Sequence, residues 1–175
     1  MNDKPVAAGK SSYDLIDAEA AFAIIDIQPH SSFIDLACGT GNYSLEIAKY
    51  VGEQGTVYAM DLWQQGIAAL NQRISAKGIK NIKTTVADIT TQLPVEENSI
   101  DSCLLATILH DLPKKGQRAA IQEAWRVLKS GGKLNIIEFK KIERGAGPPL
   151  KTRMDEQEVE SLVTGHGFTR IAGAE

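Results

Sequence analysis

Short apolar stretches alternate along this chain with stretches in which apolar residues recur every three or four positions. The short stretches predict strands at 32–37, 55–61, 82–88, 100–107, 133–139 and 168–174. The helical spacing between them predicts helices at 17–27, 42–51, 63–78, 113–132 and 155–167. Strands that alternate with helices in this way form a doubly wound, mostly parallel sheet with helices on both faces. We therefore predict an α/β fold.

The predicted helix at 113–132 carries one clear apolar face. That face is formed by Ile121, Ala124, Trp125 and Leu128. We therefore expect Trp125 to lie in the core. Gly131 and Gly132 are expected to end the helix, because glycine is the residue most often found just past a helix C-terminus.

The composition is that of one globular domain. The chain has 175 residues, of which 43% are hydrophobic and 23% are charged, which suits a single sizeable core. Residues 1–16 are mostly small or polar, so we expect a mobile N-terminal segment there and one domain over 17–175. The net charge is -3 and no stretch is strongly basic, so no nucleic acid partner is expected.

Two further features bear on where the protein works. Its two cysteines, Cys38 and Cys103, lack the paired spacing of a disulfide framework or a zinc site, so we expect a reducing compartment and no metal. No apolar run approaches the roughly 18–20 residues that span a bilayer, and the N-terminus lacks the apolar core of a signal peptide. We therefore expect a cytoplasmic protein that has no membrane partner.

The segment FIDLACGTGNYS, residues 33–44, places a turn with two glycines directly after the first predicted strand. Ligands of such sheets bind beyond the carboxyl ends of the strands, and Gly39 and Gly41 let the backbone approach a ligand closely. The dinucleotide-binding pattern has a glycine or alanine at the position of Ser44. In addition, the Asp35 carboxylate would repel a pyrophosphate. The turn favours a ligand that has an ammonium group and no phosphate, such as S-adenosylmethionine (SAM). Asp35 could alternatively serve only to hydrogen-bond the amides of the turn.

Two further acids end the next two predicted strands. Asp61 ends the second strand, where a carboxylate can accept hydrogen bonds from both hydroxyls of a ribose. Asp88 ends the third strand and can accept from the exocyclic amine of adenine, although it could instead only cap a short turn. Leu62, Trp63 and Ile89 lie beside these acids and could sandwich an adenine ring, although Trp63 could instead belong to the core.

In their order along the chain, these motifs resemble those of the class I SAM-dependent methyltransferases. The resemblance covers residues 14–171 and is carried by DLACGTGNYS, YAMDLW, VADITTQLP, IDSCLLATILHDL and EAWRVLKSGGKLNIIEFKK. It is greatest to small-molecule enzymes similar to the ubiquinone and menaquinone C-methyltransferases and the arsenite methyltransferases. It implies a Rossmann-like sheet with strand order 3-2-1-4-5-7-6. It also implies SAM as cofactor, S-adenosylhomocysteine as product and a small-molecule methyl acceptor.

The resemblance also implies a set of cofactor-binding residues. They are Asp35, Ala37, Gly39 and Gly41 around the methionine part, Asp61 at the ribose, Leu62, Asp88 and Ile89 at the adenine, and Thr107 on the sulfonium side. His110 and Asp111 would reach the acceptor side, with His110 as the candidate general base. His110 could instead be a hydrogen-bonded structural residue, and Asp111 could only cap the helix that follows it.

The chain also departs from the family pattern. It ends where the seventh strand should begin, so that strand is expected to be missing or supplied by another part of the structure. Two cysteines are too few for the arsenite methyltransferase pattern, so no arsenic chemistry is expected. A second subunit could complete the acceptor side. An NAD(P)-dependent oxidoreductase and a non-catalytic protein that binds SAM or a partner remain as alternatives.

Overall fold

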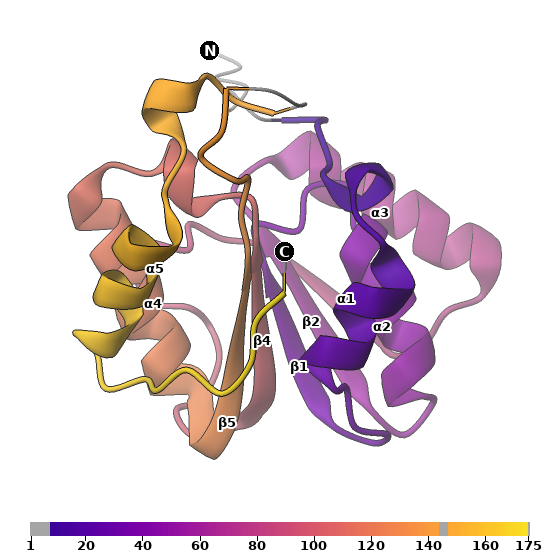
Figure 1. Cartoon of the computed structure of the whole chain (residues 1–175). Coiled ribbons are helices and arrows are strands. Elements are labelled where there is room, and N and C mark those ends of the chain that lie inside the picture. Colours follow the sequence, from indigo (N-terminus) through magenta and orange to yellow (C-terminus); the bar gives the residue numbers. More distant parts are fainter. Residues whose placement is uncertain (1–7, 144–146, 175) are drawn as a thin grey trace.

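A computed structural model describes residues 8–143 and 147–174, which form one sheet between two layers of helices (Figure 1). The sheet of the described residues is parallel throughout, with strand order β3-β2-β1-β4-β5. Its strands are β1 Ser32–Leu36, β2 Thr56–Asp61, β3 Ile82–Val86, β4 Ile100–Ala106 and β5 Leu128–Ile137. The order reverses between β1 and β4, so the switch point of the sheet lies directly beyond these two strands.

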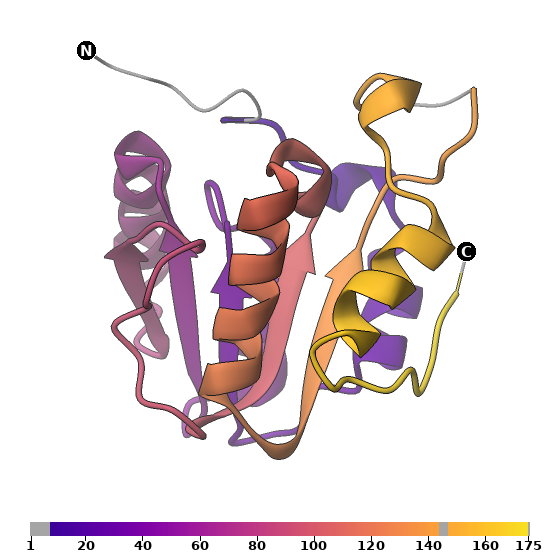
Figure 2. The ribbon, with the colours of Figure 1, turned by 90° about the vertical axis from the view of Figure 1, so that its left-hand side faces the viewer.

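The helices divide between the two faces of the sheet (Figures 1 and 2). On one face lie α1 Ala18–Ile25, α2 Asn42–Val51 and α3 Gln64–Lys77, and on the other α4 Lys114–Val127 and α5 Glu156–Thr164. Short 3-10 turns occur at η1 Tyr13–Leu15, η2 Leu109–Asp111 and η3 Leu150–Thr152. Within the described ranges, no helix is both long enough and apolar enough to cross a bilayer.

Alternation along β1 supplies a core on each side of the sheet. Phe33 packs into the cluster that the sheet forms with α1, α2 and α3. Ile34 and Leu36 point the opposite way, into the cluster that contains the buried face of α4. Asp35 lies between them in sequence and shares the side of Phe33, so its carboxylate is directed toward α2. The pleat of one strand thus places a single charged group under the glycine turn.

Five of the six predicted strands are confirmed, and the sixth, at 168–174, is wrong. These residues form no strand, and Ile171 is 78% exposed. In the expected order, the sixth strand pairs only with the seventh, and the described residues contain no seventh strand. Without that neighbour the backbone groups of 168–174 have no ladder to join, so the segment stays irregular.

The predicted helix at 113–132 also ends earlier than expected. It stops at Val127, and Leu128 already pairs with Ile100 as the first residue of β5. Pairing with β4 therefore ends the helix before the two glycines are reached. Gly131 and Gly132 lie instead where the register between β4 and β5 shifts. The prediction that Trp125 lies in the core is wrong, because Trp125 is 50% exposed. Its ring meets the Phe168 ring edge-on, with 4.8 Å between the ring centroids. It lies at the side of the apolar face, toward the segment that follows α5.

The N-terminal segment, residues 8–16, crosses the edge of the sheet at which the strands end (Figures 1 and 2). Ser12 is only 4% exposed, and the Tyr13 ring packs against the Tyr43 ring of α2 at 5.2 Å. The expected mobility of residues 1–16 stays a prediction. Residues 1–7 of that segment lie outside the described residues.

The glycine turn is shaped by two left-handed glycines with different surroundings. Gly39 has φ +58, and a Cβ built on it has no heavy atom within 4 Å. Gly41 has φ +78, and a Cβ there would lie 2.3 Å from Cδ1 of Leu70, a fully buried residue of α3. Gly41 therefore allows α2 and α3 to pack, whereas Gly39 leaves open space in front of the turn.

Replacing Gly41 with alanine should destabilise the fold more than replacing Gly39. Both variants place an L side chain in the left-handed region, at roughly 1–2 kcal/mol each. Gly41→Ala adds overpacking against Leu70, so its total loss should be about 2–5 kcal/mol. Urea unfolding of the two variants measures the difference, and equal losses would contradict this description of the turn.

Candidate functional site

A polar residue or the glycine turn lies at the carboxyl end of every strand in the described sheet. In spatial order they are Asp88 after β3, Asp61 on β2, the glycine turn after β1, Thr107 after β4 and Glu138 after β5. Neighbouring strands are about 4.8 Å apart, so this edge spans roughly 20 Å. The predicted site residues are therefore brought to one edge, as expected for an open parallel sheet.

The Asp61 carboxylate joins two loops of this edge. Its Oδ2 accepts a hydrogen bond from the Gly39 amide at 2.7 Å, and its Oδ1 accepts from the Trp63 amide at 2.7 Å. Each oxygen uses one lone pair in this way, which leaves each with a second lone pair. Asp61 is half-buried and keeps the capacity to accept from two adjacent hydroxyls of a ligand.

Asp88, Leu62 and Ile89 flank Asp61 but differ in what they present. Asp88 is half-buried, and its Oδ1 accepts from both the amide and the hydroxyl of Thr90. No hydrogen bond among the described residues reaches its Oδ2, so capping of the turn leaves one oxygen available. Leu62 is 59% exposed and offers an apolar surface. Ile89 is 6% exposed and lies in the core, so its side chain supports the edge from below.

Asp35 is buried under the glycine turn with Ser44 as its partner. The carboxylate is 1% exposed, and the Ser44 hydroxyl donates to its Oδ2 at 2.5 Å. Burial raises the pKa of Asp35, the hydrogen bonds from Ser44 lower it and the nearby Asp61 charge raises it, and the net result is a pKa of about 7. Ser44, the residue that departs from the dinucleotide pattern, therefore ties this acid to α2.

Two of the five non-glycine residues with positive φ in the described ranges flank the switch point. Ala37, after β1, has φ 63 and Thr107, after β4, has φ 52, both in the left-handed region. Such conformations persist where the surroundings enforce them, and they cluster at binding sites. The far side of the turn is fixed by Arg73 of α3, which donates to the Thr40 carbonyl and to Oδ1 of Asn42, each at 2.7 Å.

The acceptor side of the edge is organised by Glu138, a residue that the sequence analysis missed. Oε1 of Glu138 accepts from the Leu109 amide at 2.9 Å, and its Oε2 lies 2.7 Å from Nδ1 of His110. The His110 side chain is only 4% exposed. Burial alone would lower the pKa of His110, but the Glu138 carboxylate outweighs it and the pKa is raised. Glu138 directly follows the fifth strand, as Asp88 follows the third, and this position in the sequence could have identified it as a candidate.

Asp111 is the more accessible of the two candidate acceptor-side residues. Its side chain is 26% exposed, and its Oδ1 lies 3.7 Å from Nε2 of His110. It does not cap the following helix, because α4 begins after Pro113 and has no side-chain cap. Of the two residues, Asp111 is thus the one able to meet a ligand.

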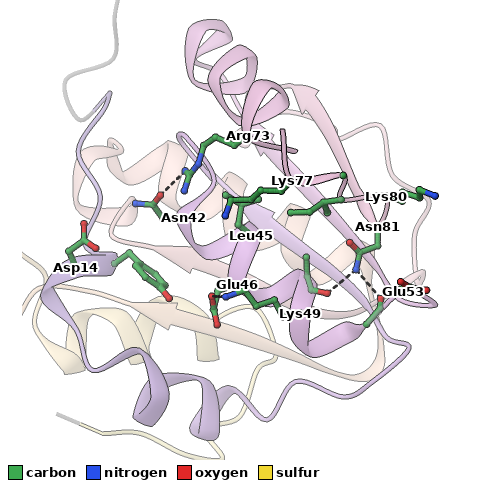
Figure 3. A pocket seen from close by; sticks show the side chains of 15 residues that line it. Asp14, Asn42, Leu45, Glu46, Lys49, Glu53, Arg73, Lys77, Lys80 and Asn81 are labelled. Carbon is green, nitrogen blue, oxygen red and sulfur yellow. Dashed lines mark hydrogen bonds and ion pairs between the residues drawn. The ribbon is translucent and has the colours of Figure 1, made fainter. Parts of the chain in front are cut away.

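A wide groove of about 990 Å³ runs between α2 and α3, from beside the glycine turn to Asn81 at the far end of α2 (Figure 3). Much of its polar lining is engaged within the protein. Lys49 pairs with Glu46, and Asn81 donates to two carbonyls at the end of α2. Arg73, at the end of the groove next to the glycine turn, is bonded to that turn. The groove gathers charges of both signs and none of the predicted site residues.

Comparison with known proteins shows the family of the chain. A family profile described as "Methyltransferase domain" matches residues 33–132, which include the glycine turn, Asp61, Asp88 and Thr107. The chain belongs to this methyltransferase domain family. It is 31% identical over 115 residues to a demethylmenaquinone methyltransferase of Bacillus mycoides, and 32% identical over 114 residues to one of Shouchella clausii. These matches cover 66% and 65% of this chain and 47% of each relative, so the chain spans about half the length of its curated relatives.

Solved structures place the fold in the same group. A SAM-dependent methyltransferase from Aquifex aeolicus superposes with a TM-score of 0.81 at 28% identity, covering 90% of this chain and 82% of that one. The [4+2]-cyclase SpnF superposes with a TM-score of 0.71 at 20% identity, covering 85% of this chain and 54% of the cyclase. That second likeness shows the fold alone, and a cyclase among the neighbours means that the chemistry has to be argued from the site.

The buried Asp35 carboxyl should make stability depend on pH. Its pKa is raised in the folded state, so its contribution to stability is complete below about pH 4 and is lost as pH rises to about 7. Relative to Asp35→Asn, the wild-type protein should lose up to roughly 4 kcal/mol of unfolding free energy across this range. Urea unfolding of both proteins at several pH values measures the difference.

Ser44→Ala provides the matched control for this prediction. It removes the hydrogen bond that lowers the pKa of Asp35, so the loss of stability should extend to higher pH. A difference between wild type and Asp35→Asn that is the same at every pH would contradict the assignment of the raised pKa to this carboxyl.

Proposed function

We propose that this chain binds SAM along the carboxyl edge of its sheet and transfers the methyl group to a small-molecule acceptor. The observation that carries the proposal is the pair of acids on adjacent strands, Asp61 and Asp88, beside the open space in front of Gly39. Both acids retain acceptor capacity, and nothing in the described structure fills that space. The methyltransferase family and the names of the relatives support the same reaction.

The residues fit SAM part by part. Asp61 would hold the ribose hydroxyls with the lone pairs that Gly39 and Trp63 leave free. Asp88 would take the adenine amine at its Oδ2, and the exposed Leu62 would cover a face of the ring. The turn from Ala37 to Gly41 would line the methionine part, which carries no phosphate. The buried Asp35 would support the turn through Ser44 without needing to touch the cofactor.

Bound SAM supplies a methyl group on a positively charged sulfur, which is a good leaving group. The protein then has to hold the acceptor in line with that methyl group and to exclude water, and such alignment lowers a barrier by about 7–11 kcal/mol at best. Thr107 lies between the cofactor side and the acceptor side of the edge. The chain therefore needs few reactive side chains of its own.

On the acceptor side we assign different roles to the two candidates. His110 is buried and held by Glu138, so it acts as a positioning residue that fixes the turn after β4. Asp111 is accessible at that turn and is the group able to receive a proton from the acceptor. Because the relatives are named demethylmenaquinone methyltransferases, demethylmenaquinone is the first acceptor to test.

Asp61→Asn should weaken SAM binding by roughly 10- to 100-fold, because an amide loses one of the two acceptor oxygens and a charge-assisted hydrogen bond. Titration calorimetry with SAM measures the effect, with NADH as the comparison ligand. Asp101→Asn is the matched control, because its carboxylate binds Ser32 at the opposite end of the sheet. Binding of NADH in place of SAM, or equal affinity of both variants, would contradict the proposal.

Asp111→Asn should leave the dissociation constant for SAM within about twofold of wild type and lower turnover by roughly 100-fold or more, as expected for the loss of a general base. Release of S-adenosylhomocysteine with demethylmenaquinone and a pool of small acceptors measures turnover. Unchanged turnover in this variant would remove Asp111 from the reaction. SAM binding by the wild type without turnover of any acceptor would favour a non-catalytic role.

A further inference from the structure

The groove between α2 and α3, here called the α2–α3 groove, has its charges sorted by side (Figure 3). Two basic residues, Arg73 and Lys77, project into it from α3. The acids of the groove come from other elements, namely Asp14 from η1, Glu46 from α2 and Glu53 from the residues after α2. The α3 side is therefore the part of the groove that attracts an anion.

Arg73 and Lys77 both keep hydrogen-bond donors that the fold does not use. Arg73 is half-buried, and its Nη1 donates to the Thr40 carbonyl and to Oδ1 of Asn42, each at 2.7 Å. Within the described ranges, nothing accepts a hydrogen bond from its Nε or its Nη2. Lys77 makes no ion pair and no hydrogen bond with any described residue. The groove thus offers two cations without an anionic partner.

The two cations share one side of α3. Residues four positions apart on a helix are about one turn apart, with roughly 5–6 Å between their Cβ atoms, and like charges at this spacing repel. Glu46 faces the same groove but is paired with Lys49, at 2.5 Å between Oε2 and Nζ. Figure 3 shows Lys77 extending along the groove toward the end where Arg73 lies. An anion bound between them would contact both cations and remove their repulsion.

The chemistry of this pair favours a phosphate monoester. The planar guanidinium of arginine matches two phosphate oxygens, and the lysine ammonium adds a second positive charge. A phosphate monoester carries close to two negative charges at neutral pH, which balances the two cations. The groove has about 990 Å³, within the range of roughly 300–1,000 Å³ of small-molecule sites, and Leu45, Ala48 and Ile79 add apolar lining. A phosphate attached to a small apolar group therefore fits.

Arg73 connects this groove to the glycine turn. The Thr40 carbonyl that it holds lies between Gly39 and Gly41. An anion on the free side of the guanidinium stabilises the conformation of the turn in which Arg73 binds Thr40. The space in front of Gly39 is open in that conformation. A ligand in the groove and a ligand at the turn then favour the same conformation, so each raises the affinity for the other.

We propose that the α2–α3 groove binds a small phosphate monoester between Arg73 and Lys77, and that this binding is coupled to the cofactor turn through Arg73. The site contains none of the residues assigned to the cofactor, so the two ligands can be bound together. The binding does not depend on the proposed function, whereas the coupling rests on it.

Titration of the ¹⁵N-labelled chain with phenyl phosphate, followed through amide chemical shifts, tests the site. Phenol supplies the ring without the charge, inorganic phosphate supplies the charge without the ring, and benzoate carries a single negative charge. Lys77→Met removes the ammonium and keeps the apolar stem. Lys115→Met is the matched control, because Lys115 is an exposed residue of α4 on the other face of the sheet.

Phenyl phosphate should shift the amides of residues 40–45 and 73–80, and the other three compounds should bind more weakly. Lys77→Met should weaken phenyl phosphate binding roughly tenfold, as for loss of a charge-assisted hydrogen bond, and Lys115→Met should stay within about twofold of wild type. Absence of binding, shifts confined to other residues, or equal affinity of Lys77→Met and wild type would overturn the site. Benzoate binding as tight as that of phenyl phosphate would overturn the assignment to a phosphate.

Calorimetry with SAM at saturating phenyl phosphate tests the coupling. SAM should bind about fivefold more tightly to wild type in its presence, and Lys77→Met should lose this effect at the same concentration. An unchanged affinity of wild type for SAM would overturn the coupling. If wild type binds phenyl phosphate in the groove but does not bind SAM, the proposed function and the coupling fail while the phosphate site stands.

Discussion

The hydrogen bond from the Gly39 amide to the Asp61 carboxylate is the interaction on which the rest of the site depends. It joins the turn after β1 to the end of β2, the two elements between which a ligand at this edge has to lie. The same carboxylate holds the start of α3 through Trp63. One acid thus fixes the shape of the turn and keeps unused acceptor capacity at its surface.

The packing below this bond explains why the turn can be both open and rigid. Gly41 lets Leu70 of α3 pack directly against the turn, and Arg73 of the same helix binds the Thr40 carbonyl. Beneath the turn, Asp35 is buried against Ser44 at the cost of a raised pKa. Gly39 faces open space. The turn is therefore held by α3, by Asp61 and by the buried Asp35–Ser44 pair, and the space in front of Gly39 is open to a ligand.

The sequence was informative where the signal is local and weak where it depends on a distant partner. Alternation and helical spacing placed most elements, and acids at strand ends placed Asp61 and Asp88, because parallel strands end at a common edge. The segment 168–174 has the composition of a strand, but a strand also needs a neighbour. The half-exposed Trp125 packs on Phe168, and the buried His110 is held by Glu138, so the surroundings of both depend on residues far away in the sequence. The contact of Ser12 with Thr107 joins residues 95 positions apart, which no local pattern reveals.

A crystal structure of the chain with S-adenosylhomocysteine tests the central claim most directly. The account predicts the adenosine over β2 and β3, with its ribose on Asp61, and the amino acid end across the glycine turn toward β4. Density for the ligand in the groove between α2 and α3, or along β4 and β5 without contact to Asp61, would contradict it.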